Sequence, residues 1–168
     1  MKITNTTTRM LLIACLSLPL LAACQGETGA DEEAVAVQAP LTAPTGTDEN
    51  EWNAYLTDAV TRNIGAATST YVYTLPAETD PDFEGSYQRQ LEKAQTDIAR
   101  GVLPGTLLAF GSPSSAKSAD LAVAALEGAQ PGSMEGVRFL FIGTPADNQR
   151  VAALAEPTGV EYVFVEAK

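Results

Sequence analysis

Two short, uninterrupted apolar runs constrain the fold of this 168-residue chain more than any other part of its sequence. They are TLLAF at residues 106–110 and RFLFIG at residues 138–143, and turn-forming residues bound both of them. Such runs are typical of strands buried on both faces, as in a parallel sheet covered by helices. Gly-[Ser/Thr]-Pro stands at the end of each run, as Gly111-Ser112-Pro113 and Gly143-Thr144-Pro145, which predicts helices with Ser112 and Thr144 as N-caps and a proline at the first helical position.

Helical and strand patterns alternate over the remainder of residues 48–168. Helices are expected over residues 48–64, 83–98 and 145–155 and between the two apolar runs, and further strands over residues 69–75 and 160–167. The order αβαβαβαβ predicts a single α/β domain, with a small, mainly parallel four-stranded sheet and helices packed on it. The first and last strands are expected at the edges, and the strand order is left open.

The N-terminus has the pattern of a signal segment. Lys2 and Arg9 precede an apolar run that begins at Met10, and this run is too short to span a bilayer as a mature helix. It ends in LAAC at residues 21–24, and polar residues follow. This ending resembles the lipobox of bacterial lipoproteins. The alternative is an ordinary secretory signal that contains an incidental cysteine.

The resemblance implies that residues 1–23 are removed and that Cys24 becomes the lipid-modified first residue of the mature chain. In the sorting pattern of this family, Gln25 after the cysteine implies the outer membrane, with the domain on the periplasmic side. Residues 25–47 contain three glycines, two prolines, four acidic residues and no aromatic residue. That composition predicts that residues 24–47 are a lipidated cysteine and a flexible linker.

The composition of the mature chain excludes several functions. The resemblance implies that Cys15 leaves with the signal segment and that Cys24 carries lipid, which would leave no thiol for a disulfide, a metal or catalysis. The chain has no histidine, which excludes Ser-His-Asp and Cys-His catalysis and imidazole zinc sites. Loss of Lys2 and Arg9 reduces the ten basic residues to eight against 21 acidic residues, a formal charge of −13. Nucleic acid is therefore a poor partner, and a basic protein is a better one.

A candidate site lies where the loops after the strands meet. The carboxyl ends of parallel strands share one edge of a sheet, so PAETDPDFEG, GSPSSAKS and GTPADNQ are expected to form a common rim. The rim combines helix N-termini, which favour anions, with an acidic loop, which repels them. The candidate residues for a ligand or partner are Asp80, Asp82, Glu84, Ser112, Ser114, Ser115, Lys117, Ser118, Thr144, Asp147 and Asn148.

Residues 111–118, GSPSSAKS, differ by one residue from the phosphate-binding pattern Gly-x-x-x-x-Gly-Lys-Ser. Ala116 replaces the second glycine, and a helix that starts at Ser112-Pro113 would leave Lys117 in its second turn. No aspartate ends the RFLFIG run to help hold magnesium. A capped helix is the favoured interpretation, and no cofactor is expected.

The same residues contain Ser114-x-x-Lys117, which resembles the Ser-x-x-Lys motif of penicillin-binding proteins. A lysine of lowered pKa could activate this serine. The Ser-x-Asn and Lys-Thr-Gly motifs of that family are absent, and the domain is small for that fold. A Ser–Lys hydrolase is therefore kept as an alternative to a non-enzymatic protein.

Asp80, Asp82 and Glu84 stand at alternate positions before Gly85, as in the opening of a calcium-binding loop. The twelfth position of such a loop is a glutamate, and in this chain it is Leu91. Acidic residues beside a helix N-terminus are stabilising without a metal. No metal is expected.

The combined expectation is an outer-membrane-anchored periplasmic lipoprotein that acts as a non-enzymatic protein-binding or accessory module, of the kind that immunity proteins or inhibitors represent. The alternatives are a lipoprotein that binds a small ligand or an anion, and the hydrolase centred on Ser114 and Lys117.

Replacement of the lipobox cysteine tests the anchor. Cys24→Ser should leave an unlipidated precursor, because the thiol that accepts the lipid is lost. Mass spectrometry of the N-terminal peptide and membrane fractionation measure this. An unmodified N-terminus in the wild type, together with a mutant that still fractionates with membranes, would contradict the anchor.

Overall fold

The computed structural model describes residues 38–168. The expected signal peptide at residues 1–23, the lipidation site Cys24 and the first part of the expected linker lie outside the described residues. No helix within the described part is long and apolar enough to cross a membrane.

The structure confirms the α/β fold and the order αβαβαβαβ. The elements are α1 (Glu49–Asn63), β1 (Ser69–Tyr73), α2 (Phe83–Ala99), β2 (Thr106–Gly111), α3 (Ser115–Leu126), β3 (Arg138–Gly143), α4 (Pro145–Ala155), a 3-10 turn (Glu156–Thr158) and β4 (Glu161–Glu166). All neighbouring strands are parallel, and their order in the sheet is β1-β2-β3-β4. The first and last strands are therefore the edges, as expected.

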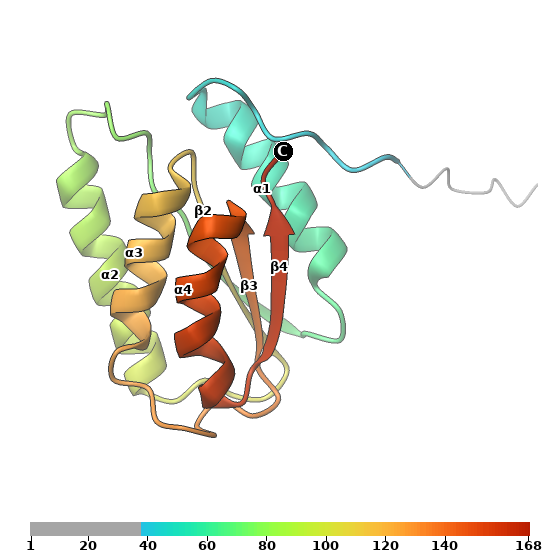
Figure 1. Cartoon of the computed structure of the whole chain (residues 1–168), viewed down its shortest axis with the longest axis vertical. Helices are drawn as coiled ribbons and strands as arrows, with labels where there is room; N and C mark the ends of the chain where they lie inside the picture. Colours follow the sequence, from blue (N-terminus) through green and yellow to red (C-terminus); the bar gives the residue numbers. More distant parts are fainter. Residues whose placement is uncertain (1–37) are drawn as a thin grey trace, which may run out of the picture. The chain divides into compact units, whose positions relative to one another are not determined.

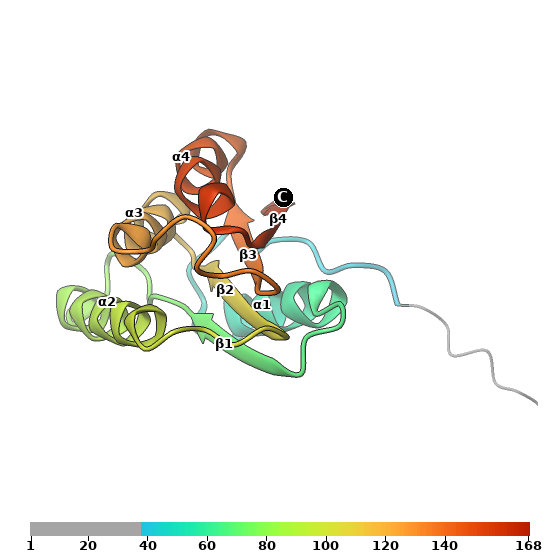
Figure 2. The same cartoon turned by 90° about the horizontal axis from the view of Figure 1, so that it is seen from below.

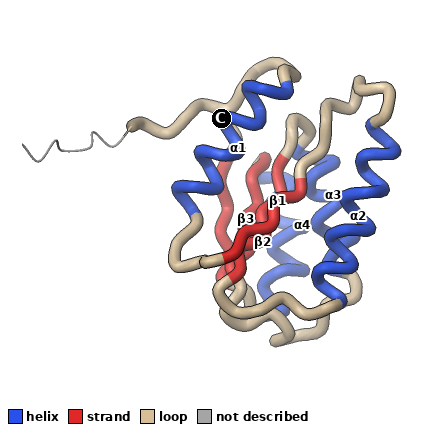
Figure 3. The backbone as a smooth tube through the Cα atoms, turned by 180° about the vertical axis from the view of Figure 1, so that it is seen from behind, coloured by secondary structure: helices blue, strands red, loops and turns tan. Residues whose placement is uncertain are grey.

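The sequential strand order decides which helix covers which face. Each connection advances by one strand in the same direction, and such crossovers are right-handed, so their helices fall on the same face. Figures 1 and 2 show α2, α3 and α4 on that face and α1 alone on the other. Figure 3 shows the sheet from behind, between these two layers.

Each face of the sheet has its own core. Toward α2, α3 and α4 the core is aromatic, and ring centroids lie 4.7 Å apart for Tyr73 and Phe110 and 5.0 Å apart for Phe110 and Phe139. Toward α1 the strands present aliphatic side chains, which pack against Trp52 and Leu56. The two central strands are thus buried on both faces, as their uninterrupted apolar runs predict.

The compact unit begins at Gln38, ten residues before the domain boundary expected from composition. Residues 38–47 lie along α1, whose side chains bind their backbone. The contacts are Arg62 Nη2 to Gln38 O (2.6 Å) and Ala39 O (3.1 Å), Leu41 N to Asp58 Oδ2 (3.1 Å) and Trp52 Nε1 to Gly46 O (2.8 Å). A further backbone bond, from Ala43 N to Lys168 O (2.9 Å), joins the segment to the residues after β4. Composition indicates how much apolar surface a segment can bury by itself. It does not indicate which polar side chains of another element bind the backbone of that segment.

The two Gly-[Ser/Thr]-Pro turns differ. Thr144 is the N-cap of α4 and Pro145 its first residue, as predicted. The prediction for α3 is wrong, because its N-cap is Ser114 rather than Ser112. The Ser112 hydroxyl is buried and donates to Ser114 O at 2.9 Å. The first helical residue is therefore Ser115, and Lys117 lies in the first turn.

Gly143 at the end of β3 allows α3 to approach the sheet. A Cβ atom there would lie 2.5 Å from Ser115 Oγ and 2.7 Å from Phe141 Cζ. Only glycine leaves room for this contact.

Gly143→Ala should therefore lower the free energy of unfolding by about 1–3 kcal/mol, the usual range for overpacking. Urea denaturation measures the difference. Gly128→Ala is the matched control, since a Cβ atom at Gly128 meets nothing within 4 Å. Equal stability of the two variants would show that α3 can shift without cost.

Candidate functional site

The loops that follow β1, β2 and β3 meet at the carboxyl edge of the sheet, as the parallel arrangement predicts. Ser114 Oγ donates to Glu78 Oε1 at 2.6 Å, which joins the first loop to the second. Ser115 Oγ donates to Asp147 Oδ2 at 2.7 Å, which joins the start of α3 to the start of α4. The rim is therefore continuous across the three loops.

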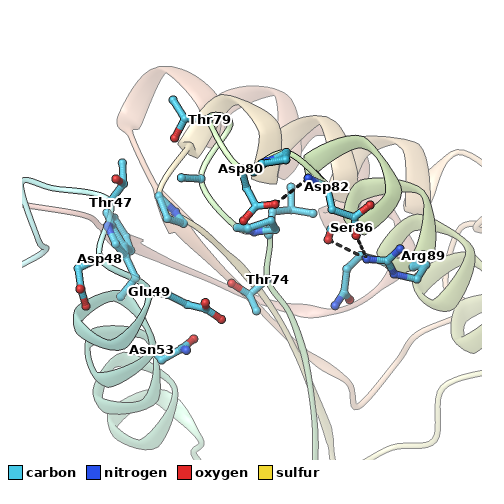
Figure 4. A pocket seen from close by; sticks show the side chains of 17 residues that line it. Thr47, Asp48, Glu49, Asn53, Thr74, Thr79, Asp80, Asp82, Ser86 and Arg89 are labelled. Atoms are coloured by element: carbon cyan, nitrogen blue, oxygen red, sulfur yellow. Dashed lines mark hydrogen bonds and ion pairs between the residues drawn. The ribbon is translucent and has the colours of Figure 1, made fainter.

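A cleft of about 800 Å³ opens at this edge, between the start of α1 and the loop that connects β1 to α2. Figure 4 shows its two walls. The residues that line it include Thr47, Asp48, Glu49, Trp52 and Asn53 from α1 and the segment before it, and Thr74, Asp80, Asp82, Ser86, Arg89 and Gln90 from β1–α2. The sequence predicts some of the cleft residues from β1–α2. It does not predict those from α1, because it does not show which end of α1 lies at the rim.

Four carboxylates and one basic side chain line the cleft. Arg89 forms an ion pair with Asp82 at 2.7 Å, so these two charges compensate each other. Asp48 accepts from Asn50 N at 2.9 Å, and Asp80 accepts from Asp82 N at 2.8 Å. Within residues 38–168 neither these two carboxylates nor Glu49 form an ion pair, so the cleft has a surplus of negative charge.

The charge of the surrounding surface has the same sign. Residues 38–168 contain 17 acidic and eight basic side chains. Six of these basic side chains already form ion pairs with carboxylates of the domain; they are Arg62, Arg89, Lys93, Arg138, Arg150 and Lys168. Few cations of the domain are therefore free to neutralise the carboxylates of the cleft.

A second polar cluster on the rim joins α3 to α4 and does not line the cleft. Asp147 accepts from Ser115 Oγ, from Thr144 Oγ1 at 2.9 Å and from Arg150, while Ser115 Oγ accepts from Thr144 N at 2.8 Å. Arg150 also donates to Asp120 and to Ala116 O. Burial raises the pKa of Asp147, but the hydrogen bonds from Ser115, Thr144 and Arg150 outweigh it and hold the pKa below its usual value.

Ser114 and Lys117 do not form a nucleophile–base pair. The Ser114 hydroxyl donates to Glu78, and its oxygen accepts from the backbone N–H of Lys117 at 3.4 Å. No hydrogen bond joins Lys117 Nζ to Ser114 Oγ in the described structure. Ser114 acts as a helix cap, and this geometry gives the hydrolase interpretation no support.

One feature of the structure favours a phosphate loop at the start of α3, and another argues against it. Lys117 lies in the first turn of α3, closer to the position that a phosphate loop requires than the sequence indicates. However, the hydroxyl of Ser114 occupies one helix N–H, and the Glu78 carboxylate lies against this hydroxyl. An anion approaching the start of α3 would meet that carboxylate and be repelled.

Two carboxylates of the acidic sequence PAETDPDFEG interact with side chains of α2. Asp82 contacts Arg89, and Glu84 Oε1 accepts from Gln88 Nε2 at 2.9 Å. Within residues 38–168 no group of three or more His, Cys, Asp or Glu side chains is arranged to hold a metal ion.

The remaining predicted residues are dispersed. Asn148 Oδ1 accepts from Tyr162 OH at 2.8 Å and so lies toward β4. Ser118 is buried in α3, and its hydroxyl has no hydrogen-bond partner among the described residues. Of the predicted rim residues, Asp80 and Asp82 line the cleft.

Comparison of the chain with protein-family models, with curated proteins and with solved structures gives no match.

Removal of the Asp147 charge tests the cluster between α3 and α4. Asp147→Asn should lower the free energy of unfolding at neutral pH by about 1–3 kcal/mol, since hydrogen bonds to an ionised group are lost. A lowered pKa in the folded state contributes stability above the unfolded pKa of about 3.9, and the contribution is lost as the pH falls through the lower folded value. The difference in urea denaturation between wild type and variant should therefore shrink in acid.

The exposed Glu127 has no ion pair among the described residues, so Glu127→Gln is the control and should change stability by less than about 0.5 kcal/mol. A cost of Asp147→Asn that stays constant as the pH falls through the folded-state pKa would mean that its charge does not contribute.

Proposed function

We propose that this chain is a lipoprotein anchored in the outer membrane through Cys24, whose domain binds a basic protein on the periplasmic side and acts as a non-enzymatic accessory module. The acidic cleft at the carboxyl edge is the observation that carries the proposal. Three carboxylates line it without an ion pair in the described structure, and the surplus of acid over the whole domain adds to their field.

Electrostatics act here at two ranges. Beyond the cleft, the surplus negative charge attracts a cationic protein and raises its association rate. Within the cleft, Asp48, Glu49 and Asp80 offer acceptor oxygens to lysine or arginine side chains. Both effects weaken as salt is added, because the carboxylates are exposed to solvent.

The distance to the membrane suits this role. Thirteen residues connect Cys24 to Gln38, and a chain of that length reaches at most about 45 Å. An anchored domain of this kind searches for partners close to the membrane surface.

The volume of the cleft also suits a small molecule, which makes a small ligand the second candidate. The unpaired carboxylates favour a cation over the anion that helix N-termini alone would suggest. A thermal shift produced by phosphate or a nucleotide, with no protein partner recovered, would support an anion site and contradict the proposal. Labelling of Ser114 by a fluorophosphonate would contradict its non-enzymatic part.

Neutralisation of the cleft tests the proposed partner class. The triple variant Asp48→Asn, Glu49→Gln, Asp80→Asn should recover at least about fivefold less of a basic envelope protein at low salt, since three favourable charges are removed. Asparagine preserves the N-cap of α1. Affinity capture from envelope extract with quantitative mass spectrometry measures the recovery.

The matched control is Glu127→Gln, Glu135→Gln, Glu156→Gln, which removes the same charge from exposed residues at the amino ends of the strands, two of them in loops and Glu156 in the 3-10 turn. It should retain most of the binding. Equal loss in both variants would indicate attraction by net charge alone, and undiminished binding by the cleft variant would exclude the cleft.

A further inference from the structure

The edge strand β1 has no protection against pairing. It pairs with β2 alone, so the outward backbone groups of Ser69–Tyr73 pair with no strand among the described residues. Its sequence, STYVY, contains no charge, proline or glycine and consists mainly of residues that favour strands. Tyr71 is 42% exposed and Val72 41% exposed.

The opposite edge strand, β4, also pairs with one strand alone among the described residues, but it carries charged residues. β4 begins and ends with the exposed residues Glu161 and Glu166, and Arg138 forms an ion pair with Glu161. The segment before α1 also contacts the chain just after β4, through the bond from Ala43 N to Lys168 O. Charges and covering segments are the devices by which natural proteins block edge pairing. β1 is therefore the less protected of the two edges and the better suited to accept a partner strand.

The available edge leads into the acidic cleft. Thr74 follows directly on β1 and lines the cleft together with Leu75, Pro76 and Ala77. A strand that pairs with β1 would therefore have one end beside the carboxylates of Asp48, Glu49 and Asp80. Main-chain pairing and charge complementarity act on the same extended segment.

The side chains of β1 toward α2 are already fixed. Lys93 Nζ lies 5.1 Å from the ring centroid of Tyr71 and 4.7 Å from that of Tyr73. Tyr73 OH donates to Asp97 Oδ2 at 2.9 Å, and Lys93 pairs with the same oxygen at 2.8 Å. An edge whose side chains are ordered before binding loses less conformational entropy when a strand is added.

We propose that β1 accepts an extended segment of a basic protein as a fifth strand, with lysine or arginine side chains at one end of that segment placed in the acidic cleft. This rests on the proposed function and specifies how its partner binds. Backbone hydrogen bonds supply affinity and the cleft supplies selectivity, as in other cases of strand addition. A second copy of this chain is a weaker occupant, because it brings the same excess of acidic residues.

Peptide probes separate the two parts of this proposal. The purified mature chain is titrated with the peptide KKVTVTKK, with KKVTVTKK N-methylated at its four central residues, and with QQVTVTQQ. N-methylation removes the amide donors on both edges of the peptide and keeps its charge. The first peptide should bind, and both others should bind at least about tenfold more weakly. Hydrogen exchange should show protection at residues 69–73 on addition of KKVTVTKK.

The three peptides test edge pairing and charge recognition separately. Equal binding of the methylated and unmethylated peptides, or protection that does not include residues 69–73, would overturn edge pairing while charge-dependent recognition stands. Equal binding of the lysine and glutamine peptides would contradict the acidic cleft as the recognition site and thereby the proposed function. Failure of KKVTVTKK to bind would overturn strand addition, and the affinity capture described above would still test the proposed function independently.

Discussion

The right-handed crossovers from each strand to the next determine what each face of the sheet can hold. Because the strand order follows the sequence, three helices lie on one face and α1 is left alone on the other. Four strands about 4.8 Å apart are wider than one helix, whose diameter with side chains is about 10 Å. α1 packs over β2 and β3, and the same face of β1 stays open, with Val72 exposed.

The cleft and the free edge are both consequences of this uneven cover. The corner left open by α1 is bounded by the start of that helix and by the loop after β1. Acidic residues gather there partly for a local reason, since Asp48 caps α1 and Asp82 stands just before the first residue of α2. Carboxylates at these positions stabilise the helices and also give the corner its negative field.

The sequence predicts the elements well because period and turn chemistry are local properties. The boundaries of β3 and α4 match those predicted, because RFLFIG is an uninterrupted apolar run and Thr144-Pro145 is a strong signal for a helix start. The start of α3 is mispredicted because two serines compete for the cap, and Ser114 is favoured by its contact with Glu78, which is 36 residues away in the chain. The cleft wall from α1 has no local signal, because it depends on which face and end of the sheet the helix meets.

The segment at residues 38–47 has a mechanical consequence. A pull on the chain at Gln38 acts first on its bonds to Arg62, and then on the contact of Leu41 with Asp58. A force that peels the segment from α1 would load these bonds one after another rather than together. The bond from Ala43 to Lys168 lies beside β4, at the far margin of the sheet from β1. Tension from the proposed membrane tether would thus act first on ten residues on one side of the domain, away from the strand edge on the other side.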